Sequence, residues 1–435
     1  MVNKKILLVI LLGFVVSINP GAREKTGESE KFIATNVRLV NSFSMGTEFL
    51  ATEKIVGSFL HRWSINGMSV AISKEGRLVY ARGFGYADTA LKFETQPFNK
   101  FRIASVSKLV TAVAIMKLRE EGKISLNDRV FGPDGILNDP YFSEPKDKRV
   151  YGITVGHLLS HEGGWTQRYG DQMFMPLVIA EKMGTQSPVD TRTIIRFALD
   201  KRLHYTPGTG HSYSNLGYTI LGLVIEKIAG VPYEEYCKKQ VLEPLGIYDM
   251  QIGGNLLADR KPFEVTYYEP RDATKKPSIY NPSEMCDACY GGNDITTLGS
   301  AGGWIATAPD LLRLLLAIDG FNTKPDILSS ESIELMTNNE NGSAPMGWKS
   351  TVSNGTWWRT GYFPGTAAMM KRQADGYSWV VLCNSSSWNG PEIYSYINGM
   401  MTKILLQTSS WPDYDLFDQS LPVPLKTTPL AGYPR

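Results

Sequence analysis

The sequence has no excess of either charge, few cysteines and no internal repeat. Across 435 residues, 45 Lys and Arg stand against 43 Asp and Glu, so the formal net charge is only +2. This balance gives no electrostatic footprint for nucleic acid. Hydrophobic residues make up 43% and charged residues 20%, which indicates neither disorder nor a fibrous protein. What remains is an ordinary globular protein, long enough for one two-lobed body or two domains.

Four cysteines are present, namely Cys237, Cys286, Cys289 and Cys383. In an exported chain they could pair in three ways, and Cys286 and Cys289 are close enough for a small bridged loop. A zinc site would need a second ligand pair at short spacing, which the two distant cysteines do not supply. The sequence therefore predicts unpaired or locally bridged structural thiols, and neither a metal nor an organic cofactor.

The only early apolar run, Ile6 to Val16, follows Lys4 and Lys5 and is too short to cross a bilayer. A basic region before such a run is typical of an export signal. Cleavage after Ser17 fits the small-residue preference only loosely, so an uncleaved anchor stays an alternative. We expect residues 1–22 to be a signal peptide or N-terminal anchor. The protein would then be periplasmic or secreted, and any membrane association would go through this segment alone.

Alternating apolar and polar residues predict antiparallel strands at both ends of the sequence. Near the start, Met68–Ile72 and Leu78–Phe84 flank a turn at residues 74–76 and predict a hairpin exposed on one face. Near the end, the predicted strands are Thr356–Gly361, Ala367–Arg372 and Tyr377–Asn384. Strands so far apart in the sequence imply one sheet closed by distant segments, and therefore a discontinuous domain.

Helical patterns separate these strands. The segment Ser105–Gly122 is apolar nearly all round and predicts a buried helix that begins at Ser105. The other predicted helices are Glu48–Trp63, Thr193–Leu203, Ser214–Ala229, Tyr233–Leu245 and about Pro391–Gln407. We predict one domain over residues 31–410. Its sheet lobe would comprise about residues 31–124 and 295–410. Its helical lobe would comprise about residues 125–294, where the sequence shows no convincing hairpin. Residues 411–435 would form a Pro-rich extended tail.

Ser105-Val106-Ser107-Lys108 places a hydroxyl and an amine three residues apart on the first turn of the buried helix, so the two side chains face each other. Serine is a poor nucleophile at neutral pH unless a neighbour takes its proton. Burial would keep Lys108 partly neutral, and the helix N-terminus adds positive charge near a developing oxyanion. A helix-capping serine with a surface lysine would show the same pattern, so this motif alone is weak.

Tyr213-Ser214-Asn215 follows a turn-rich stretch and precedes a predicted helix, so the tyrosine would project from a loop. A phenol near a lysine ammonium has a lowered pKa and becomes a credible general base. Asn215 could bond a substrate amide and orient the lysine. A capping Ser-Asn pair beside a packed tyrosine is the alternative, and a lone Y-x-N favours it.

Arg359-Thr360-Gly361 lies on a predicted strand and is followed by Tyr362. Gly361 leaves room for a substrate along the strand edge, and the backbone N–H groups of Tyr362 and Ser105 could form an oxyanion hole. Arg359 offers a planar bidentate donor for a carboxylate. A solvated strand arginine is equally compatible with its position.

Two other motifs begin like known catalytic signatures but lack residues that those signatures require. His157 and His161 have helical i, i+4 spacing, but Leu158 stands where a zincin has its glutamate, so we interpret both histidines as structural. Gly210-His211-Ser212-Tyr213-Ser214 begins like the nucleophile elbow of an α/β-hydrolase but ends in serine and lacks the strand–turn–helix context. The sequence predicts neither a metalloprotease nor an α/β-hydrolase.

The three motifs occur in an order, and on predicted elements, that resemble one family. A helix-start S-x-x-K, a mid-chain Y-x-N and a late strand cation-T-G resemble the serine β-lactamase and penicillin-binding protein superfamily, in particular its class C-type members. The likeness covers about residues 45–405. The segments that add to it are Phe101-Arg102-Ile103-Ala104, Thr154 to His161, Pro207-Gly208, Ser300 to Trp304 and Thr307 to Leu311.

The resemblance implies an enzyme with a mixed α/β (α+β) fold of the β-lactamase/transpeptidase type. An antiparallel sheet flanked by helices would lie beside a helical lobe, with the active site at their junction. By that likeness Ser105 is the nucleophile. Lys108 and Tyr213 exchange its proton and later protonate the leaving group, while Asn215 positions the substrate.

Arg359 departs from the family pattern, because this position usually carries lysine or histidine. An arginine cannot deprotonate at working pH, so any acid–base part is lost while electrostatic recognition is kept. We therefore expect Arg359, Thr360 and Gly361 to bind substrate, with a preference for acyl donors that bear a carboxylate.

The sequence thus predicts an exported serine hydrolase that cleaves an amide, lactam or ester bond of a small-molecule or peptide acyl donor, in the manner of a β-lactamase or D-alanyl-D-alanine peptidase. One alternative is an esterase or acyltransferase on small acyl donors. Another is a penicillin-binding or sensor module that is acylated without turnover. A scaffold that docks through the Pro-rich tail is a third.

Overall fold

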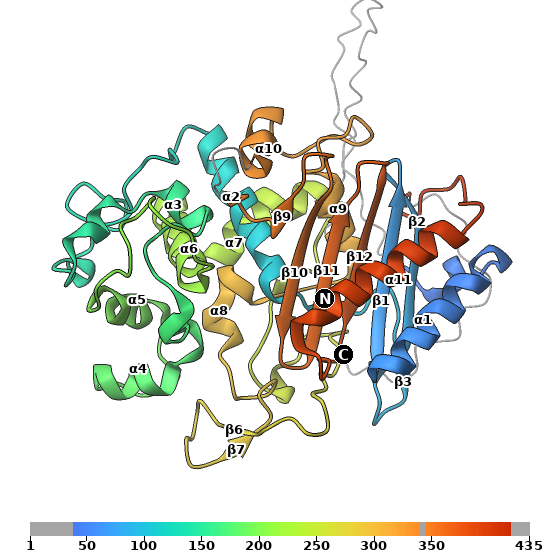
Figure 1. Ribbon diagram of the computed structural model, residues 1–435, viewed down its shortest axis with the longest axis horizontal. Coiled ribbons are helices and arrows are strands. Elements are labelled where there is room, and N and C mark those ends of the chain that lie inside the picture. The colour runs from blue at the N-terminus through green and yellow to red at the C-terminus, as the bar shows by residue number, and fades with distance from the viewer. Residues whose placement is uncertain (1–37, 339–343, 419–435) are drawn as a thin grey trace, which may run out of the picture. The chain divides into compact units, whose positions relative to one another are not determined.

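The computed structural model describes residues 38–338 and 344–418, which belong to one compact unit (Figure 1). The predicted signal or anchor at residues 1–22 lies outside the described residues, as does most of the predicted tail. Within the described ranges, no single helix is long and apolar enough to cross a membrane. One pair of helices bent by 77°, spanning Asn215–Ala229 and Tyr233–Leu245, meets the length and composition test only jointly.

A seven-stranded antiparallel sheet forms the frame of this unit, with the order β3-β2-β1-β12-β11-β10-β9. Its N-terminal strands are β1 (Gly67–Lys74), β2 (Arg77–Asp88) and β3 (Phe93–Glu94). Its C-terminal strands are β9 (Ser350–Thr351), β10 (Trp357–Phe363), β11 (Thr366–Arg372) and β12 (Tyr377–Cys383). The two sets join where β1 pairs with β12, from Met68 opposite Cys383 to Lys74 opposite Tyr377. The prediction of one sheet closed by distant segments is confirmed.

The predicted hairpin of β1 and β2 is present, but the prediction of an exposed face is wrong. On one face of β1, Val70 and Ile72 pack beneath α1 (Leu50–Trp63) and α11 (Ile393–Gln407), which cross the sheet in Figure 1. The opposite face carries Ser69, Ala71 and Ser73, which are buried as well. That face lies against α9 (Ala308–Leu316). Alternation was misleading because small residues let a helix approach the sheet closely, and serine was counted as solvent-facing.

The helical lobe lies beside the β9–β10 edge of the sheet, with α2 (Ser107–Glu120) between them (Figure 1). Its helices confirm the predicted ones to within a few residues, except that the predicted helix over 233–245 ends early and continues as a π turn and a 3-10 turn. The lobe's helices are α3 (Val155–Leu159), α4 (Pro176–Met183), α5 (Thr191–Leu199), α6 (Asn215–Ala229) and α7 (Tyr233–Cys237). The helix α8 (Ile295–Gly302) packs on both α2 and α6, and α10 (Ser330–Thr337) touches α2.

The structure contains short strands that the sequence did not predict, and those at residues 251–252, 276–277 and 285–286 lie in the region expected to contain no hairpin. A two-stranded ladder joins β6 (Lys276–Pro277) to β7 (Met285–Cys286). A second small sheet has the order β4-β8-β5, formed by Phe101–Arg102, Trp304–Ala306 and Gln251–Ile252. Each of these strands has only two or three residues, too few for a periodic pattern to show.

The described start of the predicted tail packs on the sheet instead of running free over the surface. The N–H of Leu416 donates to the carbonyl of Leu78, and Leu416 is buried. All four cysteine thiols are unpaired, which is one of the two alternatives that the sequence left open. Among the described residues, no group of three or more His, Cys, Asp or Glu side chains could hold a metal ion.

Candidate active site

The turn that carries Ser105 leads directly into the central helix. Residues Ala104–Val106 form a 3-10 turn, and α2 follows from Ser107, so the α-helix begins two residues later than predicted. Ala104 has a φ of 45°, a conformation that is uncommon for a residue with a side chain and that is typical of functional turns. The nucleophile candidate therefore projects from a sharp bend at the junction of the sheet and the helical lobe.

Lys108 lies one turn further along α2 and is completely buried. Its Nζ is 3.4 Å from Ser105 Oγ and donates to Asn215 Oδ1 at 2.7 Å and to the carbonyl of Ala301. Burial lowers the pKa of this amine to about 8, and the charge of Arg359 acts in the same direction. The neutral amine, which is the form that can accept a proton, therefore becomes available as the pH approaches 8.

Tyr213 reaches Ser105 from the loop before α6. Its hydroxyl lies 2.6 Å from Ser105 Oγ. Burial raises the pKa of the phenol, but the positive charges of Lys108 and Arg359 outweigh it and bring the pKa to about 8. Serine, lysine and tyrosine therefore form one hydrogen-bonded group in which two members can exchange a proton near pH 8.

Arg359 does not lie in the open, substrate-facing position that the sequence predicted. Its side chain is only 1% exposed. Nε donates to the Ser105 carbonyl at 2.8 Å, Nη1 to the Trp348 carbonyl at 3.2 Å and Nη2 to the Tyr213 hydroxyl at 3.1 Å. The guanidinium thus holds the turn at Ala104–Val106, called here the nucleophile turn, in place through the Ser105 carbonyl. Its positive charge also lowers the pKa of Tyr213. No signal in the sequence distinguished these protein acceptors from a substrate carboxylate.

The edge of β10 passes close to the nucleophile turn. A Cβ on Gly361 would overlap the carbonyl oxygen of Ile103 and lie 3.0 Å from the Ser105 nitrogen, so only glycine permits this approach. β10 and β11 are joined by a two-residue loop, which makes Phe363 and Thr366 a hydrogen-bonded pair. Because hydrogen-bonded and non-hydrogen-bonded pairs alternate along the two strands, the N–H groups of Tyr362 and Thr360 point away from β11. They point toward the other edge of β10, where β9 pairs only with Trp357 and Trp358. The predicted oxyanion-hole role of Tyr362 N–H and Ser105 N–H stays a prediction that this orientation permits.

Asn215 is the first residue of α6, and Ser214 caps that helix by accepting the N–H of Gly217 at 3.0 Å. Both ends of the Asn215 amide have protein partners. Oδ1 accepts from Lys108, and Nδ2 donates to Asp171 Oδ2 at 2.6 Å. The amide therefore contacts the predicted lysine, and because an amide has two N–H donors and two acceptor sites, the predicted contact with substrate stays a prediction.

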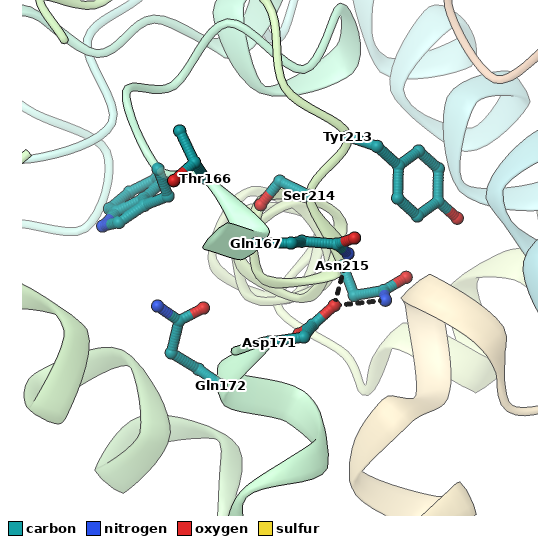
Figure 2. A pocket seen from close by; sticks show the side chains of 8 residues that line it. Thr166, Gln167, Asp171, Gln172, Tyr213, Ser214 and Asn215 are labelled. Atoms are coloured by element: carbon teal, nitrogen blue, oxygen red, sulfur yellow. Dashed lines mark hydrogen bonds between the residues drawn. The ribbon is translucent and has the colours of Figure 1, made fainter. Parts of the chain in front are cut away.

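Asp171 is the contact that sequence reasoning missed. Figure 2 shows the amides of Gln167 and Asn215 converging on its carboxylate. The residue sits in a loop without periodicity, and its only local signal is an aspartate before a short turn, where Oδ1 caps Met173. Such a cap is common in loops, so nothing in the sequence pointed to the active site.

Both histidines have structural contacts, in line with the sequence interpretation. His157 forms a reciprocal cap with Thr154 at the start of α3. His161 is buried, and its Nδ1 accepts the N–H of Ser214 at 3.2 Å. Burial, together with the charges of Arg359 and Lys108, lowers the pKa of His161 well below its usual value. The imidazole is therefore neutral, and its ring packs 4.6 Å from that of Tyr213.

The antiparallel sheet, the helical lobe and the serine–lysine–tyrosine group define the class of serine hydrolases that includes β-lactamases and penicillin-binding proteins. The family profile described as Beta-lactamase matches residues 52–398. The chain belongs to the β-lactamase family, and the predicted family and fold are confirmed.

Among curated relatives, Protein flp of Staphylococcus aureus (strain N315) is 30% identical over 193 residues, 44% of this chain and 36% of that protein. Penicillin-binding protein 4* of Bacillus subtilis (strain 168) is 25% identical over 322 residues, 71% of this chain and 65% of that protein. The chain thus spans about a third of the length of the first relative and just under two thirds of the second.

Solved structures repeat the fold. An octameric penicillin-binding protein homologue from Pyrococcus abyssi has a TM-score of 0.62 at 26% identity, covering 82% of this chain and 76% of that one. D-amino acid amidase from Ochrobactrum anthropi SV3, complexed with L-phenylalanine amide, has a TM-score of 0.63 at 20% identity, covering 83% and 98%. EstCE1, a hydrolase with promiscuous acyltransferase activity, has a TM-score of 0.60 at 21% identity, covering 82% and 96%.

Replacing Arg359 by glutamine is expected to move the pH dependence of acylation to higher pH. In the native protein the acylation rate should rise through an apparent pKa near 8, because the serine's proton needs an acceptor and the Lys108–Tyr213 pair loses its proton there. The arginine's charge lowers the pKa of both groups, so its loss raises the apparent pKa. Arg359→Lys, which keeps the charge, should shift the profile less. Rates of adduct formation from pH 6 to 10 test this, and an unmoved profile for Arg359→Gln would contradict it.

The same variant tests the predicted preference for carboxylated donors. If Arg359 braces the nucleophile turn, Arg359→Gln should slow carboxylated and neutral donors by the same factor. A loss confined to carboxylated donors would return the arginine to the substrate-binding role.

Proposed function

We propose that this chain is an exported serine hydrolase that cleaves an amide, lactam or ester bond through an acyl-enzyme on Ser105. The observation that carries the proposal is the hydroxyl of Ser105 placed between Tyr213 Oη at 2.6 Å and Lys108 Nζ at 3.4 Å. Both partners have a pKa of about 8, so either can lose its own proton near pH 8 and then accept that of Ser105. Export rests on the N-terminal basic and apolar residues alone.

In the acylation step, Ser105 Oγ attacks the carbonyl carbon of the donor as its proton passes to the Tyr213–Lys108 pair. The negative charge that develops on the carbonyl oxygen would be bound by the N–H groups of Ser105 and Tyr362. When the tetrahedral intermediate collapses, the bond to the leaving group breaks, and the same pair returns the proton to the leaving nitrogen or oxygen. Arg359 remains protonated throughout and supplies only fixed positive charge.

In the deacylation step, a water molecule takes the place of the leaving group. The Tyr213–Lys108 pair accepts a proton from it, the resulting hydroxide equivalent attacks the ester carbonyl, and Ser105 leaves with that proton. An alcohol or amine in place of water would make the reaction an acyl transfer. Because the proton acceptors serve both steps, one pH dependence should govern acylation and turnover.

For the substrate we propose amino-acid amides and small peptides, with lactams and activated esters as further donors. The support is the likeness to proteins named as a penicillin-binding protein and a D-amino acid amidase. Likeness to EstCE1 supports esters as further acyl donors.

Steady-state hydrolysis of four donors tests the proposal. A D-amino acid amide, a D-alanyl-D-alanine peptide, a penicillin and a p-nitrophenyl ester are compared on the native protein and on Ser105→Ala. We expect serine-dependent turnover of at least the amide or the peptide. Turnover of the ester alone would establish an esterase and contradict the amide proposal, and an adduct without turnover of any donor would establish a penicillin-binding or sensor module.

A further inference from the structure

We propose that Asp171 is a positioning residue that fixes the Asn215 amide with its oxygen toward Lys108. The inference rests on the proposed function, because it assigns Asp171 a part in moving the proton of Ser105. Asp171 lies in the loop before α4, far in sequence from all three motifs, and accepts a hydrogen bond from Asn215. Asp171 therefore does not touch Ser105 or Lys108 itself but contacts Asn215, which in turn contacts Lys108.

The geometry gives the Asn215 amide one favourable orientation. An amide has an accepting oxygen at one end and a donating nitrogen at the other, whereas an ammonium only donates and a carboxylate only accepts. Asn215 Oδ1 faces Lys108 Nζ at 2.7 Å, and Nδ2 faces Asp171 Oδ2 at 2.6 Å. Reversing the amide would set donor against donor at the lysine and acceptor against acceptor at the aspartate. Without the carboxylate, only the lysine end would resist this reversal.

Asp171 is itself held in place. Its Oδ1 accepts the N–H of Met173 at 3.0 Å, and its Oδ2 also accepts from Gln167 Nε2 at 2.7 Å. Figure 2 shows the two amide groups meeting at one carboxylate oxygen, while the Tyr213 ring points away from this cluster. The space enclosed between these side chains is too small to hold a water molecule, so the contacts of the carboxylate there are with protein amides.

The charge of Asp171 gives the proposal a second consequence. Burial lowers the pKa of Lys108 to about 8, and the carboxylate of Asp171 opposes this effect. Removing the carboxylate lowers the lysine's pKa further. The acidic limb of the rate profile should then move to lower pH while the maximal rate falls, a combination that a merely structural loss would not produce.

The test is a double-mutant cycle between Asp171→Asn and Asn215→Ala, read as the rate of acylation by a fluorophosphonate and by a D-amino acid amide. We expect Asp171→Asn to slow acylation by tenfold or more, with little change in KM for the amide and with the pH shift described above. In the Asn215→Ala background the same substitution should have no further effect on the maximal rate, because its partner is gone. Equal slowing in both backgrounds would overturn the inference.

Two further variants separate catalysis from folding. Asp171→Ser keeps a side chain that can cap Met173 but cannot reach Asn215, so it should be as slow as Asp171→Asn in a folded protein. Asp190→Asn removes the same charge from the cap of α5, where Oδ1 accepts the N–H of Thr193 at 2.7 Å, and should leave the rate unchanged. A native acylation rate in Asp171→Ser would also overturn the inference. If the native protein itself forms no adduct on Ser105, the proposed function fails instead.

Discussion

Replacing Lys108 by methionine should lower the rate of acylation of Ser105 by about a thousandfold, because positioned proton acceptors contribute roughly 10²–10⁴ to such rates. Methionine matches the length of the lysine side chain but cannot accept a proton. Loss of the cation would also raise the pKa of Tyr213, which lies within reach of Ser105 and is next in line as the acceptor. Both members of the pair are thus impaired by one substitution.

The fold should survive this change. Methionine fills a similar volume in this completely buried position, although Asn215 Oδ1 and the Ala301 carbonyl each lose a donor, at about 1–3 kcal/mol apiece, which a domain of this size can absorb. The measurement is the adduct-formation rate by intact-mass spectrometry, with thermal unfolding in parallel. Lys117→Met is the matched control, because Lys117 lies on the same helix, partly exposed, with only a 3.4 Å contact to the carbonyl of Ile327. A folded Lys108→Met protein that reacts at the native rate would remove lysine from the mechanism.

Replacing Gly361 by alanine should slow acylation more than a hundredfold. The added methyl would overlap the Ile103 carbonyl, which is backbone and cannot rotate away, so β10 and the nucleophile turn must separate. Separation moves the N–H of Tyr362 away from that of Ser105, and removing one oxyanion donor alone costs about 10²–10³ in rate. Overpacking of this kind also lowers the free energy of unfolding by about 1–3 kcal/mol.

Gly399→Ala is the control for that substitution. Gly399 lies within α11, and a Cβ there meets nothing within 4 Å, so alanine should raise helix stability by about 0.5–1 kcal/mol and leave acylation unchanged. Chemical unfolding and adduct formation measured on both variants separate steric overlap from a general effect of adding a methyl group. Native rates in Gly361→Ala would show that the close approach of β10 is not needed.

That Ser105, Lys108 and Tyr213 lie together could be predicted, because each motif depends on local spacing. Ser105 and Lys108 share one helical turn, and Tyr213 stands just before a helix, so each motif carries its own geometry. For Gly361 the sequence predicted a close approach by a substrate, whereas the structure places the carbonyl of Ile103 there, so the need for glycine could be predicted but the approaching group could not. The strand patterns at the two ends of the chain predicted the discontinuous sheet, and the order of the three motifs indicated the family.

The supporting contacts could not be predicted, because they join segments with no common pattern. Arg359 meets the carbonyl of Trp348, and Asn215 meets Asp171, through loops whose course only the fold determines. The buried second face of β1 was missed for a related reason, since Ser69 and Ser73 are small enough to pack under a helix. Residue type alone does not show whether a polar group faces solvent, a substrate or another part of the chain.

Intact-mass spectrometry of the native protein and of Ser105→Ala, after exposure to a fluorophosphonate, a penicillin and an activated ester, tests the acyl-enzyme most directly. The account predicts a single covalent adduct on the native protein with at least the fluorophosphonate and one acyl donor, and none on Ser105→Ala. A folded native protein that forms no adduct with any of the three reagents, or an adduct that persists in Ser105→Ala, would contradict it.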